Sequence, residues 1–131
     1  MDLEWAQATF TIDSWDQEPL TYAGGRSFSR ATVTKTFSGD IVGTSTAWLV
    51  MSMVEEQGAE YVGLETLDVT IHGRAGRFVL LHQAAGSPDL VRWAVAPGSA
   101  TDQLAGLAGS ATIEIDDDGT HTFTLEPAPA E

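Results

Sequence analysis

The sequence predicts an all-β protein, an eight-stranded antiparallel β-barrel that forms a single domain over residues 1–131. Segments in which apolar and polar residues alternate recur along the chain, with turn signals of Gly, Pro, Asp and Ser roughly every ten residues. Consecutive hairpins would keep one apolar face turned the same way, and closure into a lipocalin-like barrel removes exposed strand edges. Such a barrel has room inside for packed side chains or one small ligand.

Composition narrows the classes of protein and partner. The 131 residues, 43% of them hydrophobic, are enough for one core of ordinary size. A formal net charge of −13 with only six Lys and Arg argues against a nucleic-acid partner, because phosphate recognition needs clustered basic residues. The chain has no cysteine, which excludes disulfide and thiolate chemistry. No segment approaches the roughly 20 apolar residues of a membrane span, so we expect a soluble cytoplasmic protein with no membrane partner.

Three strands are expected in the N-terminal part of the chain. The first begins at Ala6 and ends near Trp15, and a loop with a proline and paired glycines follows over Asp16–Gly25. The second strand is Arg30–Phe37, and a tight turn at Ser38–Asp40 leads to the third, Val42–Val54.

The third strand is apolar on both faces over Ala47–Val54. Such a strand needs a cover on its outer face, either a second layer or another subunit, so we expect a homo-oligomer. If Gly39 and Asp40 form the preceding turn, and Glu55–Glu60 the following one, Trp48 lies opposite Ala31 and Leu67 and faces the interior.

Tyr61–Gln83 is predicted to be the central β-hairpin, because two runs rich in Val, Ile, Leu and Thr flank the sequence HGRAGR. With Arg74 and Ala75 at the tip, Leu67 faces His82. One face of the hairpin is then apolar except for Glu65 and His82.

The C-terminal part predicts one more strand around Leu90–Ala96 and a last hairpin, formed by Ser110–Asp116 and Thr120–Glu126. Pro97–Gly109 between them is expected to cap one barrel end and to contain at most one helical turn, with Ser99 as its N-cap. Residues 127–131 are expected to be a frayed tail.

Several segments together resemble a known family. They are Ser14–Trp15, Arg30–Asp40, Tyr61–Glu65, Gly73–Gln83 and Pro97–Gly109, and their order covers nearly the whole chain. The family they resemble is a bacterial one, domain of unknown function 3224, whose members look like allene oxide cyclase barrels. The resemblance implies an eight-stranded antiparallel barrel with a tendency to self-associate. It implies no activity, and the catalytic motifs of the related plant and polyketide cyclases have no match here.

Lys35, Glu65 and His82 are the candidate catalytic residues, because they are the ionisable side chains on one otherwise apolar surface. Desolvation is expected to raise the pKa of Glu65, which suits a general acid or base near neutrality. A desolvated lysine can also form a Schiff base with a carbonyl compound. The alternative is a buried cluster whose members satisfy one another's hydrogen bonds, as buried polar groups generally must.

Other residues are candidates for lining a ligand pocket. Aromatic and apolar side chains on the expected inner face make up this set: Tyr61, Trp48, Trp93, Leu67 and Phe78. The three histidines, His72, His82 and His121, have no metal-ligand spacing, and His121 is interpreted as a core residue. We expect no metal and no cofactor.

The sequence allows two kinds of function. The first is a small-molecule-binding barrel for an apolar or aromatic metabolite, which an isomerase or cyclase version would convert by general acid/base catalysis. The second is a structural or interaction protein with a filled core, which self-associates through the strand segment Trp48–Val54.

Overall fold

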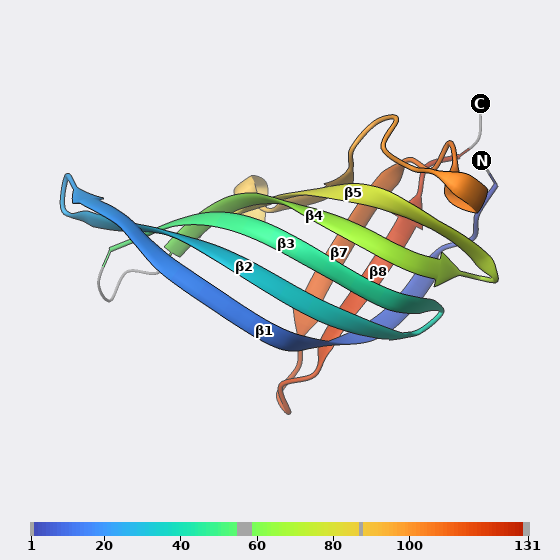
Figure 1. Ribbon diagram of the computed structural model, residues 1–131, viewed down its shortest axis with the longest axis horizontal. Helices are drawn as coiled ribbons and strands as arrows, with labels where there is room; N and C mark the ends of the chain where they lie inside the picture. Colours follow the sequence, from blue (N-terminus) through green and yellow to red (C-terminus); the bar gives the residue numbers. More distant parts are fainter. Residues whose placement is uncertain (1, 55–58, 87, 130–131) are drawn as a thin grey trace.

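The structure is a computed structural model that describes residues 2–54, 59–86 and 88–129. These residues form one sheet of eight antiparallel strands, in which each strand pairs with the next and the last pairs with the first, so the sheet closes into a ring (Figure 1). The expected all-β class and strand number are confirmed. The strands are β1 (Ala6–Ala23), β2 (Arg26–Gly39), β3 (Ile41–Met53), β4 (Ala59–Ile71), β5 (Arg74–Ala84), β6 (Arg92–Val95), β7 (Gly109–Ile115) and β8 (His121–Pro127).

The first strand is longer than expected. Residues 16–23, predicted to lie in a loop, continue β1 and pair with β2. Bulges at Asp13 and Leu20 each absorb one extra residue in this pairing. Beyond Phe10, β1 pairs with β2 alone, so Pro19 lies on an edge, where a missing N–H is tolerated. As a result β1–β4 project past the rest of the ring at one end (Figure 1).

The hairpin of β4 and β5 is present, but its turn lies two residues earlier than predicted. His72 and Gly73 form the tip, with φ of 49° and 81°, and Ile71 pairs with Arg74. Two successive residues with positive φ match the right-handed twist of the strands. Leu67 therefore pairs with Phe78 rather than with His82. The displacement is an even number of residues, so each side chain stays on the predicted face.

The predicted register of β3 is wrong by an odd number of residues, which exchanges its faces. Ala31 pairs with Leu49, and Glu65 pairs with Ala47. Trp48 therefore points away from the interior and is 52% exposed. Most of the turn expected at Glu55–Glu60 lies outside the described residues.

The C-terminal hairpin of β7 and β8 is confirmed, and β8 completes the ring by pairing with β1 from Ala6 to Phe10. The helical turn in the segment between β6 and β7 is a 3-10 turn, η2 (Asp102–Leu104), which starts after Thr101 rather than after Ser99. The Ser99 hydroxyl instead accepts a hydrogen bond from the Val79 N–H. A second 3-10 turn, η1 (Pro88–Leu90), precedes β6.

The interior of the ring is divided into two apolar clusters. The larger includes Phe37, Leu67 and Phe78, and the smaller consists of Ala31, Val33, Ala47, Leu49 and Met51, with Tyr61 packed against it. Between them lies a layer of polar residues. On each of β2, β4 and β5, the inward position next to the larger cluster carries an ionisable side chain, because inward positions alternate along a strand.

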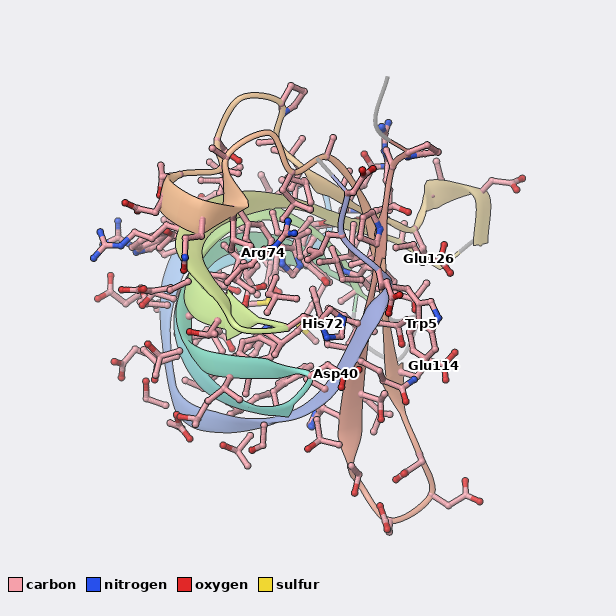
Figure 2. The ribbon with its side chains drawn as sticks, turned by 90° about the vertical axis from the view of Figure 1, so that its right-hand side faces the viewer. Trp5, Asp40, His72, Arg74, Glu114 and Glu126 are labelled. Carbon is pink, nitrogen blue, oxygen red and sulfur yellow. The ribbon has the colours of Figure 1, made fainter. Side chains whose placement is uncertain are left out.

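The end of the ring that carries the N-terminus is closed. Leu104 and Leu107, from the segment between β6 and β7, are buried in the larger cluster. At the same end the His72 ring points toward the N-terminal segment, with Nε2 3.1 Å from the carbonyl oxygen of Trp5 (Figure 2). The segment between β6 and β7 therefore caps one end of the ring, as predicted, and the interior opens at the opposite end.

Candidate functional site

The polar layer consists of four buried side chains that reach the interior from four neighbouring strands. Lys35 comes from β2, Ser45 from β3, Glu65 from β4 and His82 from β5. Lys35 pairs with Ser45 across β2 and β3, which places both side chains at one depth. All four side chains point inward because side chains alternate between the two faces of a strand, and each of these residues occupies an inward position in an otherwise apolar set.

Glu65 is the centre of this layer, and no part of it is exposed to solvent. Its Oε1 accepts hydrogen bonds from His82 Nε2 at 2.7 Å and from Lys35 Nζ at 3.2 Å. Its Oε2 accepts a hydrogen bond from Ser45 Oγ at 2.5 Å. Both carboxylate oxygens are thus satisfied, as a buried carboxylate requires.

The pKa of Glu65 is lower than that of an ordinary glutamate. Burial by itself raises this pKa, but the hydrogen bond from His82, the positive charge of Lys35 and the hydrogen bond from Ser45 together outweigh it. The expectation of a raised pKa was wrong, because it considered the apolar surroundings without these donors. Glu65 is therefore an anion at neutral pH that orients its partners, and it has no proton to give.

Tyr61 and Trp93 extend the hydrogen-bonded chain from His82. A carboxylate only accepts hydrogen bonds, so His82 carries a proton on Nε2, and its other ring nitrogen, Nδ1, lies toward Tyr61. The Tyr61 hydroxyl lies 3.4 Å from this Nδ1 and accepts a hydrogen bond from Trp93 Nε1 at 3.3 Å. Burial raises the pKa of Tyr61, so its hydroxyl stays protonated at neutral pH.

A cavity of about 150 Å³ lies against this layer. Lys35, Tyr61, His82 and His121 contribute its polar lining. The rest of the wall is apolar and consists of Phe10, Ile12, Trp15, Val33, Ala47, Leu49, Met51 and Ile113. Several of the lining side chains are exposed at the rim, so the cavity opens to solvent on one side. We refer to this cavity as the cup.

Aromatic rings fix the charged end of Lys35 at the cup. Its Nζ lies 4.7 Å from the centroid of the Phe10 ring, which is the distance of a cation–π contact. The Phe10 ring in turn packs against His121, with centroids 5.0 Å apart. The ammonium group is therefore held from one side by Glu65 and from another by an aromatic face.

The structure brings together some of the predicted site residues and separates others. Lys35 and His82 both contact Glu65, and Tyr61 lines the cup. Trp93 reaches the cup through its bond to Tyr61. The remaining three predicted residues lie elsewhere: Leu67 and Phe78 are buried in the larger apolar cluster, and Trp48 is on the outside of the ring.

Three residues of the site were missed or misread in the sequence. Ser45 was hidden by the register error, which placed the face that it shares with Ala47 on the outside. His121 was interpreted as a core residue and instead lines the cup half-buried. Trp15 was placed at the end of a strand that in fact continues past it. No pattern along β3 distinguishes the face that carries Ser45, so the sequence carried no signal for its place in the site.

Among residues 2–54, 59–86 and 88–129, no three His, Cys, Asp or Glu side chains are grouped so that they could hold a metal ion. In the same part of the chain, no helix has the length and apolar character needed to cross a membrane.

Comparisons with known proteins give a family but no activity. A structure similar to this chain is the crystal structure of a protein of unknown function from the DUF3224 family of Shewanella oneidensis MR-1. The two share 25% sequence identity and align with a TM-score of 0.79 over 99% of this chain and 100% of the other. No curated protein matches the chain. The family model described as protein of unknown function (DUF3224) matches residues 6–126. The chain therefore belongs to the DUF3224 family.

Proposed function

We propose that the protein binds a small, mainly apolar molecule in the cup and isomerises or cyclises it by proton transfer. The observation that carries this proposal is an apolar cavity whose floor presents an amine, an imidazole and a phenol. Ligand sites are usually of this kind, with an apolar wall and a few convergent polar groups. We also propose, from the sequence motifs, that the barrel resembles those of allene oxide cyclases.

The size of the cup supports a small ligand or one small reacting group. An apolar cavity of about 150 Å³ holds a molecule the size of benzene. The Lys35 ammonium has three N–H donors, and the bond to Glu65 uses one of them. A carbonyl oxygen in the cup can therefore accept a hydrogen bond from Lys35.

The proposed chemistry starts from a neutral His82 with its proton on Nε2. His82 Nδ1 is the base that takes a proton from the carbon next to the carbonyl group, while Lys35 donates to the oxygen on which negative charge develops. Return of the same proton to a different carbon moves a double bond and leaves the atom count unchanged. Glu65 stabilises the imidazolium that forms between the two transfers, since its Oε1 lies 2.7 Å from His82 Nε2.

Hydrogen–deuterium exchange at the carbon next to the carbonyl of cyclohexanone tests this chemistry without knowledge of the natural substrate. We expect the protein to accelerate this exchange in D₂O, followed by NMR, and we expect His82→Gln to slow the catalysed part by a factor of about 10²–10⁴. His72→Gln is the matched control, because His72 lies at the closed end of the ring and is expected to leave the rate unchanged. Failure of cyclohexanone to bind, or equal rates for the native protein and His82→Gln, would contradict the proposal.

A second function is favoured by the outer surface of β3, β4 and β5. Five exposed apolar side chains form adjacent rows there, Trp48, Leu64 and Leu81 in one and Val50 and Val62 in the next. We refer to these residues as the outer apolar face. Contiguous apolar patches of this kind mark interaction sites on soluble proteins. We propose that a second copy of the chain covers this face, in line with the expected homo-oligomer.

A further inference from the structure

The cup adjoins a second, wider hollow at the open end of the ring. This hollow has a volume of about 700 Å³ and is lined by residues near the ends of the projecting strands, of which Gln17, Ser29 and Met53 occupy inward positions. Ser29, at the edge of the hollow, pairs directly with Met51, which lines the cup. On β1, Trp15 of the cup and Gln17 of the hollow are successive inward residues. The two spaces therefore follow one another along the same inner face.

The wall that joins the two spaces is apolar along β3 and is exposed only at its outer end. Along β3 the inward side chains after Ser45 are Ala47, Leu49, Met51 and Met53, and their exposure rises from 1% at Ala47 to 44% at Met53. The path from Ser45 to Met53 spans roughly 26 Å at about 3.3 Å per residue. β8 pairs with β1 only as far as Phe10, so β8 does not extend along the projecting part of β1.

We infer that the ligand of the cup is an elongated amphipathic molecule, a neutral carbonyl compound whose alkyl chain runs from the Lys35–His82 floor along β3 to the hollow. This inference rests on the proposed function and adds the chemical class of the ligand. The polar floor selects the head group, and the apolar wall selects the chain. The open end leaves room for a long alkyl chain, whereas a cavity of about 150 Å³ by itself accepts only a small group.

The charges of the floor favour a neutral head group over a carboxylate. Lys35 already pairs with Glu65, which is ionised, at 3.2 Å. A ligand carboxylate at Lys35 would stand beside this buried negative charge, where like charges repel strongly. The remaining ionisable neighbours are His82, whose Nε2–H is directed at Glu65, and His121 and Tyr61 at the wall. A carbonyl oxygen accepts from Lys35 without this repulsion.

A series of methyl ketones from butanone to icosanone, followed by tryptophan fluorescence, tests the inference. We expect affinity to rise up to about fourfold with each added methylene group, and to level off once the chain passes Met53. Decanone is expected to bind more tightly than decanoate. Met53→Ser is expected to weaken icosanone, whose extended chain is long enough to reach this residue, and to leave cyclohexanone unchanged. Val42→Ser, a matched change of an exposed side chain on the outer surface, alters neither.

The outcomes separate this inference from the proposed function. If neither cyclohexanone nor any ketone binds, the proposed function itself is wrong. If cyclohexanone binds but affinity does not depend on chain length, or Met53→Ser has no effect on icosanone, the cup stands and the elongated ligand is overturned. Tighter binding of decanoate than of decanone would overturn the neutral head group.

Discussion

Glu65 is a fully buried carboxylate that stays ionised because three donors from three other strands point at it. His82 and Lys35 share one of its oxygens, and Ser45 takes the other. Removal of one partner from such a cluster leaves a charge buried without compensation, which typically costs about 3–5 kcal/mol. The polar layer therefore stabilises the fold only as a complete set.

The lowered pKa of Glu65 makes stability depend on pH. The unfolded chain binds a proton at Glu65 at higher pH than the folded chain does, so this contribution to stability is fully present above the ordinary value of 4.5. It is lost as the pH falls through the lower folded value. We expect Glu65→Gln to be less stable than the native protein near neutrality and to lose less further stability between about pH 6 and pH 3.

Urea unfolding at a series of pH values measures this difference. Glu114→Gln is the control, because Glu114 is exposed on β7 and its removal is expected to leave the pH dependence unchanged. Parallel pH profiles for the native protein and Glu65→Gln would show that the pKa of Glu65 is not lowered by folding.

For single residues, the sequence identifies which side chains can react better than it predicts their pKa values and hydrogen bonds. Lys35, Glu65 and His82 are recognisable because an ionisable residue interrupts the alternation of apolar residues on each strand. The sign of the Glu65 pKa shift was not predictable, because it depends on distances between residues far apart in the chain, and on Ser45 from a strand with the wrong predicted face. Tyr61 and Trp93 were selected as pocket residues, but their bond to each other and to His82 has no sequence signal.

Strand β3 marks the limit of what periodicity can determine. Apolar residues occupy both of its faces, so neither face is distinguished by pattern, and a one-residue error in the turn at Gly39 exchanges them. The hairpin of β4 and β5 tolerated a larger error in its turn, because that error was an even number of residues and left each side chain on its predicted face. The length of β1 was missed for a different reason. Pro19 was taken as a loop residue, but an edge strand tolerates it, and the paired glycines form the turn that follows the strand.

Gly63 is required where β4 passes between its two neighbours. It faces inward, pairs with Leu49 on one side and with His82 on the other, and has no room for a side chain. A Cβ atom here would lie 2.3 Å from the carbonyl oxygen of Trp48 and 2.6 Å from Cδ2 of Leu49. We expect Gly63→Ala to lower the free energy of unfolding by about 1–3 kcal/mol, the usual cost of overpacking a core.

The midpoint of urea unfolding measures the effect of Gly63→Ala. Gly86→Ala is the matched control, because a Cβ at Gly86 meets no atom within 4 Å, and its stability should differ little from that of the native protein. A Gly63→Ala variant as stable as the native protein would mean that β3 and β4 separate easily at this point.

On the scale of the whole molecule, the net charge of −13 opposes self-association through the outer apolar face. Two copies that meet through this face bury apolar surface but bring two acidic molecules together, and salt screens the repulsion. We therefore expect self-association to strengthen as the salt concentration rises. Trp48→Ser, which removes the largest side chain of the face, is expected to weaken association at every salt concentration.

Sedimentation velocity at low and high salt measures this association. Trp5→Ser is the control, because Trp5 is also exposed but lies at the closed end of the ring, away from the outer apolar face (Figure 2). A native protein that stays monomeric at high salt, or a Trp48→Ser variant that associates as strongly as the native protein, would rule out this face as the interface.

The seam between β1 and β8 joins the first strand of the sheet to the strand that the ribosome makes last of the eight. Ala6 pairs with Leu125, and Phe10 with His121. Until β8 emerges, the nascent sheet keeps two free edges, each able to pair with a strand of another chain. The larger apolar cluster also lacks Phe123 and Leu125 during that interval. The ring therefore closes only after β8 has been made, and chaperone protection matters most until then.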